Sequence, residues 1–117
     1  MTASLPQSSY SELFLWLLRR RKRFRINGLS MLPLLQPGEE VLVNLYAYQA
    51  SFPQVDDLVV ALHPHHPDLH IIKRVVAVAE DGSCFLKGDN LAQSDDSRSF
   101  GAISLERILG RVTSRFA

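Results

Sequence analysis

Two residues in this 117-residue sequence have the types and surroundings needed for chemistry on a carbonyl group, Ser30 and Lys73. Ser30 lies in the stretch GLSMLP, where glycine and proline favour a turn that can present a hydroxyl. Lys73 lies in IIKRVVAV, and the period of two along a strand places it on one face with Ile71 and Val75. Burial disfavours the charged form of lysine, and a neutral amine can deprotonate a serine hydroxyl. The pattern therefore permits a serine nucleophile with a lysine base.

Each of these features also has a purely structural interpretation. Ser30 fits an ordinary turn residue. Lys73 stays charged if it faces outward on an edge strand or extends its amine into water. The polar segment 87–101, KGDNLAQSDDSRSFG, fits a loop whose Asp, Asn and Ser side chains bond to their own backbone. Taken singly, no segment establishes a catalytic site.

Together and in this order, the three segments resemble the type I signal peptidases and the wider group of Ser-Lys peptidases. GLSMLPLLQPGEEVLV is similar to the nucleophile box of that group, and IIKRVVAV is similar to its general-base box. KGDNLAQSDDSRSFG is similar to the box Gly-Asp-Asn…Ser-x-Asp-Ser-Arg-x-x-Gly. The resemblance spans residues 28–112. It implies a mainly β, signal-peptidase-like or LexA-like catalytic core that needs no metal or organic cofactor.

The resemblance also implies a role for individual residues. Ser30 would be the nucleophile, Lys73 its general base, and Ser94 the hydroxyl that orients the lysine amine. The serine would attack a peptide carbonyl, form an acyl-enzyme and release it with water, as in a Ser-His-Asp triad whose histidine is replaced by lysine.

Four further residues match supporting positions of the resembled group. Asp96 and Arg98 correspond to an ion pair that holds the loop against the catalytic strand. Asp89 and Asn90 correspond to supporting residues of the same loop.

The sequence departs from the resembled group at the oxyanion hole and beside Ser94. Gly28 stands where some members have a serine that donates its side chain to the oxyanion, so the expected oxyanion region is Gly28 with the backbone N–H of Ser30. Gln93 stands where asparagine is expected.

The third departure concerns the membrane. The apolar stretch Leu13 to Leu18 has six residues, whereas a spanning helix needs about 20, and no small-residue cleavage site follows it. We therefore expect a cytoplasmic protein that is peripheral to a membrane at most. A compact chain of this kind resembles the nickel-type superoxide dismutase maturation proteases. The expected substrate is the N-terminal leader of that dismutase precursor, and the alternative is a signal peptidase that acts on other leader peptides.

Short apolar strands must position these residues. Turn signals separate β-branched runs, which predicts a small, mostly antiparallel β domain. The predicted strands are residues 40–46, 57–63, 69–79 and 83–88. The C-terminal segment 103–116 fits either a short helical turn followed by a strand or one helix.

An amphipathic helix is predicted before the catalytic domain. The S-x-x-E pattern from Ser9 to Glu12 is typical of a helix start, and apolar residues at helical spacing extend the helix from Tyr10 to about Lys22. We expect residues 1–25 to form this helix and a basic segment, and residues 26–117 to form the catalytic domain.

Basic charge is confined to the N-terminal part of the chain. Residues 1–30 carry six basic and one acidic side chain, a net charge of +5, and residues 31–117 carry a net charge of −4. This distribution argues against nucleic-acid binding by the whole domain. The basic run at residues 19–25 fits a solvated helix end, a contact with an acidic partner, or attachment to anionic lipid through residues 13–25.

Four histidines fall within eight residues, His63, His65, His66 and His70. Imidazole suits nickel, but the prolines in HPHHP favour a turn between two strands, so we expect no metal site. Cys84 is the single cysteine, which excludes an intrachain disulfide.

Two other functions share parts of this pattern. An autoprotease of the LexA type uses the same Ser-Lys logic, but residues 1–29 leave no room for a DNA-binding helix-turn-helix. A non-catalytic binding module would keep the fold and hold a partner with the basic helix.

Overall fold

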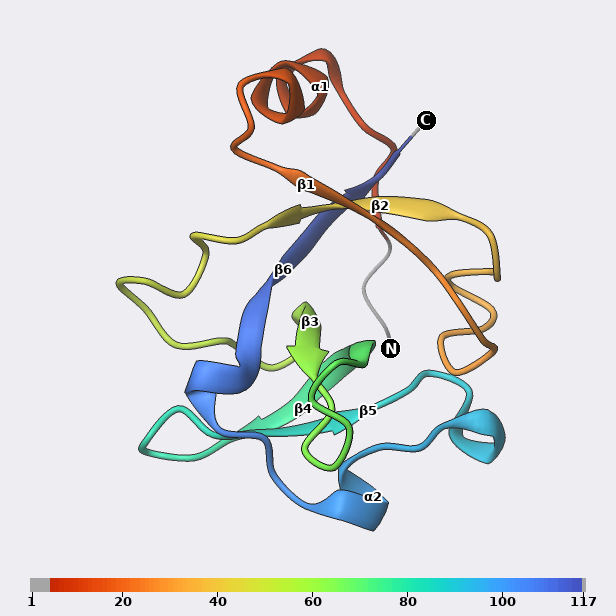
Figure 1. The fold of residues 1–117 in the computed structure, drawn as a ribbon, viewed down its shortest axis with the longest axis vertical. Helices are drawn as coiled ribbons and strands as arrows, with labels where there is room; N and C mark the ends of the chain where they lie inside the picture. Colours follow the sequence, from red (N-terminus) through yellow and green to blue (C-terminus); the bar gives the residue numbers. More distant parts are fainter. Residues whose placement is uncertain (1–4, 117) are drawn as a thin grey trace.

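A six-stranded antiparallel sheet forms the body of the protein in the computed structural model, which describes residues 5–116 (Figure 1). The strand order is β1-β2-β6-β3-β4-β5. Figure 1 shows β6 running between the β1–β2 pair and the β3–β4–β5 group. The strands are β1 Lys22–Arg25, β2 Glu40–Asn44, β3 Leu58–Leu62, β4 His70–Val78, β5 Cys84–Lys87 and β6 Ile108–Arg115. The predicted mainly β fold is confirmed.

Strand β3 lies at the centre of the packing because both of its faces are buried. Val60 belongs to one apolar cluster with Val41 and Val112, while Val59 belongs to a second cluster with Leu86 and others. Burying an apolar side chain of this size contributes about 1.5–3 kcal/mol. The two clusters together hold β4 and the loops after β1 and β5 in fixed positions.

The N-terminal helix is shorter than predicted. Helix α1 spans Tyr10–Leu17, and the Ser9 hydroxyl accepts a hydrogen bond from the Glu12 N–H as the predicted cap requires. The chain then turns at Arg19, which has a φ of 62°. Residues 22–25, predicted as the helix end and its basic extension, instead form β1 and pair with β2. Pairing of Lys22–Arg25 with β2 therefore overrides the helical pattern of the sequence. The boundary that the sequence predicted between residues 25 and 26 coincides with the end of β1.

The remaining helices are single turns within the chain that connects β5 to β6. α2 spans Ser97–Phe100, and two 3₁₀ turns span Leu91–Gln93 and Leu105–Arg107. The last of these leads directly into β6, so the C-terminal segment follows the first of the two alternatives, a helical turn followed by a strand. Within the described residues, none of the helices has the length and apolar character that crossing a membrane requires.

Candidate active site

Lys73 is buried on β4, the strand next to the edge strand β5. It lies on β4 opposite Val59 of β3, and its relative exposure is 5%. The structure therefore excludes the outward-facing interpretation. Burial lowers the pKa of Lys73 from its ordinary value, while the carboxylates of Asp96 and Asp95 oppose this shift and the Arg98 guanidinium adds to it. The site thus holds a lysine whose amine loses its proton more readily than an exposed lysine does.

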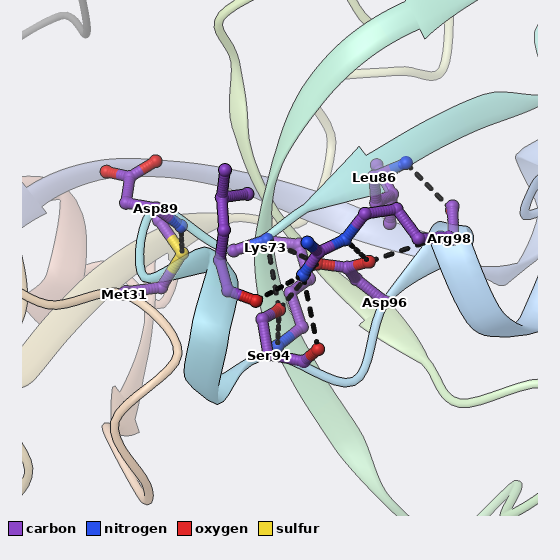
Figure 2. A network of polar contacts seen from close by, with 10 residues as sticks. Met31, Lys73, Leu86, Asp89, Ser94, Asp96 and Arg98 are labelled. Atoms are coloured by element: carbon purple, nitrogen blue, oxygen red, sulfur yellow. Dashed lines mark hydrogen bonds and ion pairs between the residues drawn. The ribbon is translucent and has the colours of Figure 1, made fainter.

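The Lys73 amine is oriented by Ser94 (Figure 2). Lys73 Nζ donates to Ser94 Oγ at 3.2 Å, and Ser94 Oγ donates to Asp96 Oδ2 at 2.7 Å. Asp96 is a carboxylate that only accepts, so the serine hydrogen must point toward it. The Ser94 oxygen is then left to accept from the amine and from the Gly88 N–H at 3.1 Å. One N–H of Lys73 is therefore committed to Ser94, and the other side of the amine remains available.

Asp96 is fully buried and carries the charge that organises this network. Burial disfavours the Asp96 carboxylate, but hydrogen bonds from Arg98, Ser94 and the backbone N–H of Gly88 hold its pKa well below the usual range. Arg98 Nε lies 2.9 Å from Asp96 Oδ1, and Arg98 also donates to the Leu91 carbonyl. Asp96 and Arg98 thus form an ion pair that ties the loop together.

Ser30 lies in a turn that is hydrogen-bonded to the loop after β5. The Asn90 N–H donates to the Ser30 carbonyl at 2.7 Å, and Asn90 Nδ2 donates to the Leu29 carbonyl at 3.0 Å. The Asp89 N–H contacts Met31 Sδ at 3.4 Å (Figure 2). Segments that are about 60 residues apart in the sequence therefore hold one another in register.

Gly28 has a φ of +89°, a conformation that glycine adopts without strain and serine does not. Open space surrounds its α-carbon, since an added Cβ would meet no atom within 4 Å. The backbone conformation at this position, and not a lack of room, thus favours glycine over the serine of some members.

Gly88 lies where the Ser30 turn and the Ser94 loop approach each other most closely, and the sequence analysis did not single it out. A Cβ at this position would lie 2.4 Å from Ser94 Oγ and 2.5 Å from the Ser30 carbonyl oxygen. A glycine is therefore required for the nucleophile turn and the Ser94 loop to approach each other. The signal in the sequence was the Gly-Asp dipeptide that opens the third segment.

Arg74 and Asp89 form a second ion pair that sequence reasoning missed. Arg74 Nε and Nη2 donate to the two carboxylate oxygens of Asp89 at 2.9 and 3.0 Å, and both side chains are at most 7% exposed. The pair attaches the Asp89–Asn90 turn to β4. Alternation along β4 places Arg74 on the face opposite to Lys73, yet both side chains are buried. Arg74 can be buried because the loop after β5 supplies the Asp89 carboxylate and the Asp56 carbonyl accepts a further hydrogen bond.

A groove of about 550 Å³ contains both Ser30 and Lys73. Its walls are β1 with the residues that follow it, and residues 68–72 at the start of β4. No hydrogen bond joins Ser30 Oγ to Lys73 Nζ in the described part of the chain. Catalytic hydrogen bonds commonly shorten only when substrate is bound. The groove thus brings together the residue types for acyl transfer with an open space beside them.

Three of the four histidines lie near one another, since the His63 ring centroid is 5.9 Å from that of His65 and 4.8 Å from that of His66. His63 is buried and contacts Asp95, His65 and His66 lie in the exposed turn, and His70 starts β4. Among residues 5–116, no group of three or more His, Cys, Asp or Glu side chains is arranged to hold a metal ion.

Comparison with known proteins identifies the family. Residues 13–81 and 79–117 match the family described as "Signal peptidase, peptidase S26". The mitochondrial inner membrane protease subunit 2 of Danio rerio is 32% identical over 110 residues, which cover 76% of this chain and 60% of the relative. Subunit 1 of the same protease from Schizosaccharomyces pombe is 31% identical over 108 residues, covering 76% and 69%. Signal peptidase I of Aquifex aeolicus is 38% identical over 58 residues, covering 50% and 23%.

These relatives bear on two predictions, the cytoplasmic location and the nickel superoxide dismutase substrate. The chain spans about 60% of the length of the Danio rerio subunit. The expected cytoplasmic location is wrong, because the similar proteins are proteases of the mitochondrial inner membrane. None of the relatives named above is a protease of nickel superoxide dismutase. The family match extends from residue 13 to residue 117 and includes all three segments that meet around Lys73, so this chain belongs to the peptidase S26 family of signal peptidases.

Proposed function

We propose that this protein is a serine endopeptidase in which Ser30 is the nucleophile and Lys73 the general base, and that it removes a leader from a protein precursor. The observation that carries the proposal is the buried Lys73 amine, oriented by Ser94 and sharing a groove with Ser30. Membership of the signal peptidase family supports the same reaction class.

The geometry suggests how the proton moves. Lys73 Nζ takes the hydrogen of Ser30 Oγ as the oxygen bonds to the peptide carbonyl carbon. When the C–N bond breaks, Lys73 returns that proton to the leaving amine, and an acyl-enzyme on Ser30 remains. Lys73 then takes a proton from a water molecule as the water oxygen bonds to the acyl carbon. The bond between that carbon and Ser30 Oγ breaks, Lys73 returns the proton to Ser30 Oγ, and the carboxyl product leaves. Ser94 holds the amine in place by accepting one of its N–H groups.

The backbone N–H of Ser30 is our candidate donor to the oxyanion. It makes no hydrogen bond within the described residues, so it is available for a substrate. The left-handed Gly28 two residues earlier shapes the turn that presents it. A single oxyanion donor contributes about 10²–10³ in rate.

Two free strand edges favour an extended substrate. β1 pairs with β2 on one side, and β5 pairs with β4 from Arg74 onward. The outer edges of residues 22–25 and 70–73 therefore border the groove without a strand partner in the described part of the chain. An extended leader would add backbone hydrogen bonds to these edges and place its scissile carbonyl at Ser30.

The substrate is the finer part of the proposal. The resemblance of the sequence to nickel superoxide dismutase maturation proteases favours the precursor of that dismutase as the substrate. Two of the relatives are subunits of mitochondrial inner membrane proteases, and this similarity favours precursors located at a membrane as substrates.

Mass spectrometry of both precursor types after incubation with wild type, Ser30→Ala and Lys73→Ala tests the proposal. We expect one cut at the mature amino terminus of a true substrate, lost in both variants. A cut that persists in Ser30→Ala would disprove the dyad. If wild type leaves every precursor intact while a Ser30-reactive acyl probe labels it, the dyad stands and the substrate assignment fails. No labelling in the folded protein would favour the non-catalytic binding module.

A further inference from the structure

His63 is a buried side chain whose two ring nitrogens are both hydrogen-bonded, yet it takes no part in the mechanism above. Its relative exposure is 4%. Nδ1 accepts a hydrogen bond from the His65 N–H at 3.1 Å, which assigns the ring hydrogen to Nε2. Nε2 then donates to Asp95 Oδ2 at 3.0 Å. His63 is thus a fixed donor aimed at one carboxylate.

Asp95 is the residue next to Ser94, and its own side chain is 66% exposed. Among the described residues, His63 is its hydrogen-bond partner. The His63 ring also packs edge-on against Phe100, with centroids 4.9 Å apart. His63 therefore contacts both ends of the segment from Asp95 to Phe100, which begins directly after Ser94.

The charge of Asp95 reaches the catalytic amine. The groups that act on Lys73 are the carboxylates of Asp96 and Asp95 and the guanidinium of Arg98. Asp96 has Arg98 as its own counter-ion, whereas Asp95 is held by an imidazole whose Nδ1 accepts a hydrogen and therefore carries no extra proton. The Asp95 charge is therefore the less compensated of the two.

We propose that His63 and Asp95 form a positioning pair that holds a negative charge and the Ser94 loop against the Lys73 amine. The inference rests on the proposed function only in calling Lys73 the general base. Two effects follow from the pair. The charge favours the protonated amine and so counters burial, and the hydrogen bond restrains the backbone that places Ser94.

The first test measures the pH at which the Lys73 side chain titrates, without any substrate. An NMR titration of the Lys73 side chain is run on wild type, Asp95→Asn and Asp81→Asn. Asparagine keeps an oxygen that accepts from His63 but removes the charge, so the Lys73 titration midpoint moves to lower pH. Because Asp95 is exposed, this shift shrinks as salt is added. Asp81, an exposed carboxylate in the β4–β5 turn, is the matched control and leaves the midpoint unchanged.

The second test separates the hydrogen bond from the charge. His63→Ala releases Asp95, so the Lys73 midpoint moves in the same direction as in Asp95→Asn, while His63→Gln, which keeps a donor, restores most of the wild-type value. In the double variant His63→Ala/Asp95→Asn the shift equals that of Asp95→Asn alone, since the two act through one contact. With a cleaved precursor, His63→Ala lowers kcat about ten-fold with little change in KM, as expected for a misplaced catalytic group.

An unchanged Lys73 titration in folded Asp95→Asn and His63→Ala would overturn the pair. A shift in His63→Ala that His63→Gln does not restore would also overturn it, because a general packing defect would then explain the result. A shifted titration in a protein that cleaves no precursor would support the pair and reject the proposed function.

Discussion

The carbonyl oxygen of Ser30 and the backbone N–H of Asn90 are joined by a hydrogen bond of 2.7 Å, across 60 residues of sequence. This bond fixes the distance between the candidate nucleophile turn and the loop that carries Ser94. The activity of the protein should therefore depend on residues that neither take nor give a proton.

Gly88→Ala should abolish most activity and also lower the free energy of unfolding. The added methyl would lie 2.4 Å from Ser94 Oγ and 2.5 Å from the Ser30 carbonyl, so both loops must move apart. Because a misplacement of about 1 Å can cost 10²-fold, we expect kcat/KM to fall by about that factor. Cleavage assays with circular dichroism measure the two effects.

Gly82→Ala is the matched control for this change. Gly82 has a φ of +86° in the β4–β5 turn, and its added methyl would meet side chains of Phe52 and Leu105 at 3.1 Å. We expect a loss of about 1 kcal/mol in the free energy of unfolding, with kcat/KM unchanged. Equal loss of activity in both variants would contradict a specific role for Gly88.

The pH dependence of cleavage should report Lys73. The base must be neutral, so kcat/KM rises as pH increases through the pKa of Lys73 and falls when the amine is protonated at lower pH. Since burial lowers that pKa, the rise occurs below the range of an exposed lysine. Initial rates of cleavage between about pH 5 and pH 11 measure this rise in kcat/KM. A rise that tracks the ordinary lysine value of 10.5 would show that the buried amine is not the base.

Asp96 should stabilise the fold at neutral pH and lose that effect in acid. Its pKa is depressed in the folded state, so its contribution is complete above the unfolded value of 3.8 and disappears as pH falls below it. Asp96→Asn should cost about 1.5–3 kcal/mol at pH 7, the range for hydrogen bonds to a charged group. Urea unfolding of both proteins from pH 7 to pH 2 should show this difference narrowing. A constant difference would mean that the carboxylate charge is not responsible.

Arg74 and Asp89 should show strong coupling. Arg74→Met leaves a buried carboxylate without its cation and should cost about 3–5 kcal/mol. The double variant Arg74→Met/Asp89→Leu removes both charges and should recover much of that stability, as measured by urea unfolding. Additive losses in the double variant would contradict the coupling of this pair.

The sequence predicted most strands because the local signals were consistent. The runs at residues 40–46, 57–63, 69–79 and 83–88 correspond to β2, β3, β4 and β5, with differences of at most two residues at any end. The helix from Tyr10 to Lys22 was partly wrong. Its cap and first turns are local features, whereas Lys22–Arg25 became a strand through pairing with residues 40–43. No helical propensity encodes that distant partner.

By itself, the sequence determined which segments belong to the site, since Ser30, Lys73 and Ser94 lie in three motifs that can be read without a structure. Only the tertiary structure decided how these segments meet. The approach at Gly88 depends on contacts between loops far apart in the chain, as does the contact of His63 with Asp95. The physical reason is that burial and hydrogen-bond partners are properties of the assembled sheet. A lysine, a histidine or a glycine has the same local sequence whether or not the fold brings a carboxylate or a neighbouring loop beside it.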